Sequence, residues 1–289
     1  MAACIMLAGG LRPSPLMRAT GRSVLDLWIT ERETVLDRWM RKLAEVREDS
    51  NGAWPLRIIH DAVLPPPWPP EARPETVRIE IEPTPLRGPA GLLRDVCLRY
   101  PNASHVLVVE AARAFAGSLG RLIERHLASG ADATVAANAD GSPAGVYIIR
   151  CAALGVVPAI GFMDLKEQWL GRAQSAGFTM RIEKMRETMS HQLRDRRQFL
   201  AAAAALRDGA SSRSIICRGA QVLPGAIVRE SVVMAGAVVE SGATVSRSLI
   251  CPDTRVQAGR DLADSVITAD VAFAGDCAQA GRLETAATE

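Results

Sequence analysis

The sequence of 289 residues lacks a long apolar run, a strong net charge and closely spaced cysteines. No apolar stretch approaches the roughly 20 residues that span a bilayer, and the N-terminus has no basic start of a signal peptide. We therefore expect a cytoplasmic protein without a membrane partner. The formal net charge is only +2, which argues against a strongly basic surface for nucleic acid.

The six cysteines form no CxxC pair and no cluster with zinc-like spacing. They are scattered through apolar stretches, where a free cysteine behaves as a small buried hydrophobic residue. We therefore expect free structural thiols rather than a disulfide framework.

The first two hundred residues alternate strand-like and helix-like segments. Several of the strand-like segments are nearly continuous apolar runs, which is typical of strands buried on both faces. Alternation of this kind predicts an α/β fold with a mostly parallel sheet and ligands at the carboxyl ends of its strands. The expected strands are 4–8, 56–62, 77–81, 106–109, 133–137, 145–149 and 178–182. The expected helices are 33–46, 91–100, 119–129 and 165–176.

The last part of the chain repeats every 17 residues, as the column of Ser214, Ser231, Ser248 and Ser265 shows. β-branched residues and glycines recur in further columns, with a sub-period close to six. Such columns are typical of stacked coils. They predict a short left-handed parallel β-helix over residues 211–277, and exposed ends that favour an oligomer.

The remaining boundaries follow from these two patterns. Residues 1–185 form the predicted α/β domain, and residues 186–210 are basic and then alanine-rich, which predicts a linker helix. Residues 278–289 follow the last coil, and we expect them to be a disordered tail.

Two motifs point to a phosphate-bearing ligand. The first strand ends in Leu7, Ala8, Gly9 and Gly10, and the loop after it carries Arg12, Arg18 and Arg22. A second motif, "LRGPAGLLRD" at residues 86–95, leads into a helix whose free N–H groups suit an anion or a ring acceptor. The alternative for the second motif is a plain turn between a strand and a helix.

An α/β domain opened by LAGG, a linker helix and hexapeptide coils together resemble the sugar-1-phosphate nucleotidyltransferases, or nucleotide-sugar pyrophosphorylases. The mannose-1-phosphate guanylyltransferases and glucose-1-phosphate nucleotidyltransferases are members of this family. The resemblance covers nearly the whole chain and implies a Rossmann-like, mostly parallel three-layer domain. In that family a sugar phosphate attacks the α-phosphate of a nucleoside triphosphate and releases pyrophosphate, with Mg²⁺ held by two aspartates.

Carried over residue by residue, the resemblance assigns three groups of positions. Arg12 and Arg22 take the catalytic roles, with Arg22 at the place of a lysine that contacts the triphosphate. The sugar side falls to Gly145, Asp164 and Lys166. The nucleotide-binding positions are Leu7, Ala8, Gly9, Gly10, Gly88, Ala90 and Gly91.

The metal positions depart from the family pattern. The aspartate of the family's Asn-Gly-Asp motif corresponds to Ala112, and Glu110 is the nearby carboxylate. Gln192 stands in the place of the second aspartate, with Asp195 as a substitute if the register differs. An amide is a poor anchor for Mg²⁺, which is usually held by carboxylates and phosphates.

These departures favour a member of the family that has lost turnover. It would bind a nucleoside triphosphate or a nucleotide sugar and act as a regulatory or structural subunit, in a homo-oligomer or with an active paralogue. The alternative is an active nucleotidyltransferase that uses Mg²⁺. A hexapeptide acyltransferase needs a histidine base on the coils, and all four histidines precede residue 211.

Overall fold

The structure of the chain, a computed structural model, divides into two compact units. We call Met1–Arg12 with Trp39–Ser190 the sheet unit, and Pro13–Arg38 with His191–Glu289 the coil unit. A segment near the N-terminus therefore belongs with the C-terminal coils. The described residues are 3–8, 14–48, 55–60, 77–81, 87–99, 104–186, 190–207, 214–268 and 272–274.

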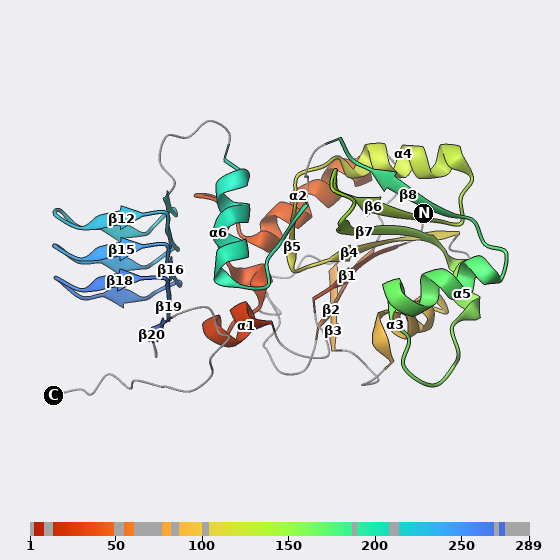
Figure 1. Ribbon diagram of the computed structural model, residues 1–289, viewed down its shortest axis with the longest axis horizontal. Helices are drawn as coiled ribbons and strands as arrows, with labels where there is room; N and C mark the ends of the chain where they lie inside the picture. The colour runs from red at the N-terminus through yellow and green to blue at the C-terminus, as the bar shows by residue number, and fades with distance from the viewer. Residues whose placement is uncertain are drawn as a thin grey trace. The chain divides into compact units, whose positions relative to one another are not determined.

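A seven-stranded sheet with the order β3-β2-β1-β4-β7-β6-β8 organises the sheet unit (Figure 1). Strand β1 is parallel to β2 and β4, and β6 is parallel to β8, which confirms a mostly parallel sheet. The strands are β1 (Ala3–Leu7), β2 (Leu56–His60), β3 (Val77–Ile81), β4 (His105–Glu110), β6 (Ala133–Ala137), β7 (Pro143–Arg150) and β8 (Met180–Lys184).

Strand β7 is antiparallel to both of its neighbours, β4 and β6. The cause lies in the tight connection between β6 and β7, where the N–H of Asn138 donates to the carbonyl of Ser142 at 2.8 Å. A short turn can join antiparallel strands, whereas a parallel crossover needs a dozen or more residues. The strand alternation of the sequence did not predict this reversal.

Helices cover both faces of the sheet. On one face α3 (Gly88–Cys97), η3 (Cys151–Val156), η4 (Leu165–Trp169) and α5 (Leu170–Ser175) share a buried core with the strands. Ala133 of β6 belongs to this core, whereas its neighbour Thr134 contacts His126 of α4 (Leu119–Ser129) at 2.8 Å. Adjacent strand residues point to opposite faces, so α4 covers the other face, as Figure 1 also shows.

Helix α2 (Val35–Glu48) carries the chain from the coil unit into the sheet unit. Its residue Trp39 stacks on Phe115 of the short strand β5 (Arg113–Phe115), with the ring centroids 6.1 Å apart. Strand β9 (Ser190–Gln192) marks the return of the chain to the coil unit.

Three parallel sheets build the C-terminal part of the coil unit, β10-β13-β16-β19, β11-β14-β17 and β12-β15-β18 (Figure 1). Each strand pairs with the strand one repeat further on, as Val232 does with Leu249. Residues such as Val239 and Val256 fill the interior. The strands are β10 (Ile215–Ile216), β11 (Gln221–Val222), β12 (Ile227–Arg229), β13 (Val232–Val233), β14 (Val238–Val239), β15 (Thr244–Ser246), β16 (Leu249–Ile250), β17 (Arg255–Val256), β18 (Asp261–Ala263) and β19 (Ser265–Ile267).

The serine column forms a ladder along the stack. The N–H of Ser248 donates to the Oγ of Ser231 at 2.9 Å, and the N–H of Ser265 donates to the Oγ of Ser248 at 3.0 Å. These serines are buried, and a buried hydroxyl needs a hydrogen-bond partner. The ladder supplies one at each step, which explains why serine recurs in this column.

Strand β20 (Ala272–Ala274) ends the stack differently, because it pairs with β19 in the antiparallel direction. The tail expected at 278–289 lies outside the described residues. The parallel pairing agrees with a hexapeptide β-helix, whereas its left-handedness and the Rossmann-like description of the sheet unit stay predictions.

The coil unit also contains α1 (Pro15–Thr20), η1 (Val24–Asp26) and α6 (Arg196–Ala205). Helix α6 lies within the range predicted as a linker helix, 186–210, but it begins only at Arg196. Asp195 sets this start, because its carboxylate accepts from the N–H of Gln198 at 2.8 Å. The domain boundaries predicted at 185 and 210 stay predictions.

Within the described part of the chain, no helix is long and apolar enough to cross a membrane. The five cysteines in that part, from Cys4 to Cys251, are free.

Candidate functional site

The carboxyl ends of β1 and β4 lie side by side. Leu7 is in register with Glu110, and the N–H of Ala111 donates to the carbonyl of Leu7 at 2.9 Å. In mostly parallel sheets this edge is where ligands bind. Glu110 therefore stands at the position where the sequence predicts a substitute metal ligand.

Three donors surround the carboxylate of Glu110. Its Oε1 accepts from the hydroxyl of Tyr147 at 2.9 Å and lies 2.7 Å from the Nζ of Lys166. Its Oε2 accepts from the Nε of Arg113 at 3.1 Å. We call these four side chains the Glu110 cluster.

The cluster is assembled from four elements. Glu110 ends β4, Arg113 begins β5 and Tyr147 lies in the middle of β7. Lys166 stands in the first turn of η4, whose start is capped by Asp164. The carboxylate of Asp164 accepts from the N–H of Lys166 at 2.7 Å.

Asp164, expected on the sugar side, therefore acts locally as a helix cap. It also receives an N–H at 2.8 Å from Glu167, and its own N–H donates to Gln168 at 2.7 Å. Satisfying these N–H groups fixes the start of η4. The cap thereby helps to place Lys166 beside Glu110.

Gly145 makes room for the pair between Glu110 and Arg113. Its φ is +72°, and a Cβ added there would lie 2.7 Å from the Cδ of Arg113 and 3.0 Å from the Oε2 of Glu110. A side chain at this position would be strained and would displace the guanidinium. Of the three residues predicted on the sugar side, Gly145 and Lys166 thus both lie beside Glu110.

The cluster is rich in cations. Burial raises the pKa of Glu110, but the charges of Lys166 and Arg113 and the hydroxyl of Tyr147 outweigh burial and hold this pKa below its usual value. Burial and the neighbouring carboxylate raise the pKa of Tyr147, which keeps its proton. One carboxylate between two cations leaves a formal net charge of about +1.

This arrangement does not fit a Mg²⁺ ion. A metal prefers carboxylates with free lone pairs, whereas both oxygens of Glu110 already face a cation. Among the described residues no group of three or more histidine, cysteine, aspartate or glutamate side chains is placed to hold a metal. Glu110 therefore does not act as the substitute metal ligand that the resemblance implied for it.

The second predicted metal position involves Gln192 and Asp195, and Asp195 has a different, structural role. Gln192 is exposed at the end of β9, and Asp195 caps α6 as described above. Both residues belong to the coil unit. The carboxylate proposed as a substitute ligand is therefore engaged with the backbone of its own helix.

The start of α3, where the sequence predicts nucleotide-binding positions, packs against another part of the chain. Gly88 has a φ of +70°, and a Cβ there would lie 2.5 Å from the carbonyl oxygen of Met163. The same carbonyl accepts from the N–H of Ala90 at 3.1 Å, while the N–H of Met163 donates to the carbonyl of Arg87 at 3.0 Å. The backbone of Met163 thus forms hydrogen bonds with the first residues of α3.

The side chain of Arg87 closes this loop further. It pairs with Asp95 at 3.0 Å and donates to the carbonyls of Gly161 and Pro158. Its guanidinium also lies against Gly91, where an added Cβ would come within 3.1 Å. The start of α3 is therefore closely packed, and both interpretations of the motif, nucleotide binding at Gly88, Ala90 and Gly91 or a plain turn, stay predictions.

The N-terminal loop is described in part. Leu7 lies at the carboxyl edge of the sheet, and the N–H of Ala8 donates to Ile59 at 2.8 Å. Gly9, Gly10 and Arg12 lie outside the described residues. Arg22 is exposed in the coil unit, directly after Gly21, whose φ of 63° ends α1.

Sequence reasoning missed Arg113 and Tyr147. Arg113 follows Glu110 by three residues, and a basic residue at that distance from a carboxylate at a strand end is a usable signal. Tyr147 lies within the predicted strand 145–149, so its place on a strand was available from the sequence.

Comparisons with known proteins bear on the coil unit. Residues 198–281 match the family model described as "GlmU-like, C-terminal hexapeptide". No curated protein matches the chain. The family model confirms the hexapeptide-repeat region that the 17-residue spacing predicts.

Proposed function

We propose that the chain is a nucleotidyltransferase-like protein of nucleotide-sugar metabolism that has lost turnover. It binds a nucleotide or a nucleotide sugar as a regulatory or structural subunit. The observation that carries the proposal is the Glu110 cluster, where Arg113 and Lys166 occupy the only carboxylate at the described ends of β1 and β4. The match of residues 198–281 to a GlmU-like hexapeptide domain supports the family assignment.

The loss of turnover follows from charge. Transfer of a nucleotidyl group spreads negative charge over phosphate oxygens, and a metal held by carboxylates neutralises it, which is commonly worth several kcal/mol. Since Glu110 does not fit a metal, that stabilisation is missing. No step of such a reaction is assigned to the residues of this cluster.

Binding follows from the same residues. The side chain of Lys166 is 39% exposed, so its ammonium group remains accessible while it pairs with Glu110. Arg113 is buried and supplies the second positive charge of the cluster. An anionic ligand would therefore bind here without a metal.

Two measurements test the two halves of the proposal. A pyrophosphate-release assay with several triphosphates and sugar-1-phosphates is expected to give no Mg²⁺-dependent turnover. Thermal-shift titrations with GTP, ATP, dTTP and nucleotide sugars are expected to show a stabilising ligand whose effect persists in EDTA.

A matched pair of variants assigns the site. Lys166→Gln is expected to abolish the ligand-induced shift, whereas Arg172→Gln, which removes an exposed cation from neighbouring α5, leaves it unchanged. Brisk Mg²⁺-dependent turnover would overturn the loss of activity and favour the active nucleotidyltransferase. The absence of any shift would overturn nucleotide binding.

A further inference from the structure

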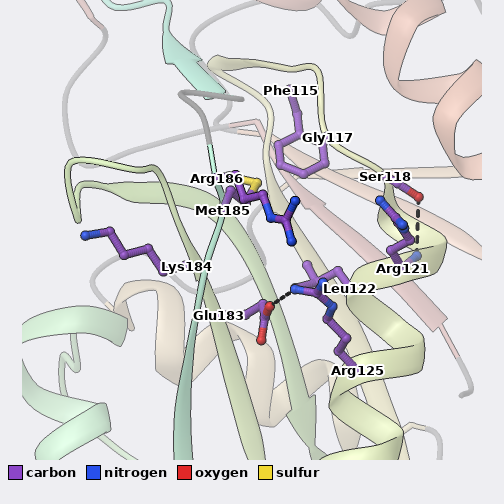
Figure 2. A pocket seen from close by; sticks show the side chains of 10 residues that line it. All are labelled: Phe115, Gly117, Ser118, Arg121, Leu122, Arg125, Glu183, Lys184, Met185 and Arg186. Carbon is purple, nitrogen blue, oxygen red and sulfur yellow. Dashed lines mark hydrogen bonds and ion pairs between the residues drawn. The ribbon is translucent and has the colours of Figure 1, made fainter.

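A cavity of the sheet unit, of about 320 Å³, lies between β5, the start of α4 and the end of β8 (Figure 2). Its size falls within the range of small-molecule sites. It shares no lining residue with the Glu110 cluster. We call it the Phe115 pocket.

The pocket combines apolar walls with an excess of arginine. Phe115 and Leu122 are buried and line it together with Met185. Arg121, Arg125 and Arg186 lie around these apolar residues, and Figure 2 shows the guanidinium of Arg186 extending toward the middle of the group.

One of the three arginines is already neutralised. Glu183 is buried and pairs with Arg125, and it also accepts from Arg181 at 3.0 Å. Burial raises the pKa of Glu183, but the hydrogen bonds from the two arginines outweigh burial and hold it below its usual value. The carboxylate in the pocket is therefore ionised and fully engaged.

The other two arginines are available to a ligand. Arg121 and Arg186 are exposed, and neither forms an ion pair with any residue that the structure describes. A guanidinium presents a planar fork of N–H donors that matches the oxygens of a phosphate.

The aromatic wall is rigid. Phe115 stacks on Trp39, and Gly117 packs so closely on its ring that an added Cβ would come within 2.7 Å. The ammonium of Lys42 lies 5.7 Å from the ring centroid and donates to the carbonyl of Gly117 at 2.7 Å. A preorganised wall lowers the cost of binding a ring or an apolar group.

The geometry points to a binding site for a phosphate monoester with an apolar or ring-shaped group. The phosphate pairs with Arg121 and Arg186, and the organic group lies in the apolar part of the pocket, which Phe115, Leu122 and Met185 line. The site is independent of the nucleotide site proposed at Lys166, because the two share no residue.

Phenyl phosphate is a suitable probe, titrated into the full-length protein by isothermal calorimetry. We expect it to bind at least five-fold more tightly than inorganic phosphate, because only the ester reaches the apolar wall. Phenol, which lacks the charge, is expected not to bind. Benzoate compares a carboxylate with the phosphate, and tighter binding of benzoate would overturn the assignment to phosphate.

Three single substitutions, each removing one positive charge, identify the site. Arg121→Gln and Arg186→Gln are each expected to weaken phenyl phosphate binding ten-fold or more. Lys184→Gln is the matched control, since Lys184 lines the same pocket but extends away from the other labelled side chains (Figure 2). We expect it to change the Kd by less than two-fold.

Two outcomes overturn the proposal. One is the absence of phenyl phosphate binding, and the other is equal weakening in all three variants, which would indicate general attraction to positive charge. Because the three residues are exposed, the variants are expected to keep the parent's melting temperature. The Lys166→Gln variant is expected to bind phenyl phosphate normally, so failure at one site is distinguishable from failure at the other.

Discussion

Glu110 and Glu183 are both carboxylates of the sheet unit held between two cationic side chains, yet the two sites use charge differently. At Glu110 both cations, Arg113 and Lys166, contact the carboxylate, and a buried tyrosine adds a third donor. At Glu183 the paired arginines are accompanied by Arg121 and Arg186, which pair with no described residue.

This difference separates cations that compensate a carboxylate from arginines that have no carboxylate partner among the described residues. In the Glu110 cluster, buried Arg113 is needed to compensate a largely buried carboxylate, so removing it should destabilise the fold. In the Phe115 pocket, the arginines at the rim are solvated and should contribute little to stability. Stability measurements on substitutions at the two sites can therefore test the comparison.

The largest effect is expected for Arg113→Met. Glu110 would lose a buried partner, and we expect the free energy of unfolding in urea to fall by about 3 kcal/mol. The double variant Glu110→Gln with Arg113→Met removes both charges of this pair and should recover part of the loss. A loss below about 0.5 kcal/mol in the single variant would mean that the pair is not structural.

Gly145→Ala should follow, with a loss of about 2 kcal/mol in the same urea experiment. The new Cβ would combine a left-handed φ with a close approach to Arg113. Gly141→Ala is the control, because its φ is +87° but nothing lies within 4 Å of its added Cβ. Equal losses in both variants would show that crowding of Arg113 contributes nothing.

Asp26 of the coil unit is a third carboxylate, partly buried and without a hydrogen-bonded cation among the described residues. Burial raises its pKa to about 7, although Arg22 lowers it in part. An acid whose pKa is higher in the folded state loses stability as the pH rises from its unfolded pKa, near 4, to about 7.

We therefore expect Asp26→Asn to stabilise the protein by about 1–2 kcal/mol at pH 8 and by little at pH 4.5. Urea unfolding at several pH values measures the difference between the variant and the parent. The exposed carboxylate Asp261 provides the control, Asp261→Asn. A stabilisation independent of pH would contradict the assignment to ionisation.

The smallest effect is expected for Arg125→Gln, at most about 0.5 kcal/mol. Arg125 is 55% exposed, and Arg181 still pairs with Glu183 after the substitution. Urea unfolding measures this loss alongside that of Arg113→Met. If Arg125→Gln costs as much as Arg113→Met, the distinction between the buried cation at Glu110 and the solvated cation at Glu183 fails.

Periodic features of this protein could be predicted from the sequence, and sites assembled over distance could not. The predicted strands 77–81 and 133–137 and the helix 119–129 have the bounds of β3, β6 and α4. Strands that lie 17 residues apart in the sequence pair with one another in three parallel sheets. Repetition and apolar patterning are local properties, so each repeat reinforces the same interpretation.

The contacts that decide the site are not local. Tyr147 reaches Glu110 across a pair of antiparallel strands, and the carbonyl of Met163 occupies the start of α3 from far along the chain. The first contact depends on the reversed strand β7, and the second depends on the path of residues 158–163. The motif "LRGPAGLLRD" therefore indicated a turn into a helix correctly, but it could not reveal what packs against that turn.

Strand β20 differs from the other strands of the stack because it runs antiparallel to its neighbour β19. In the serine ladder each coil offers an acceptor to the next, so one more coil could join by repeating the same contact. The antiparallel β20 takes the edge of β19 and presents a different spacing of hydrogen-bonding groups to anything beyond it. Coil number in this chain could thus change by duplication inside the array without altering the antiparallel edge at β20.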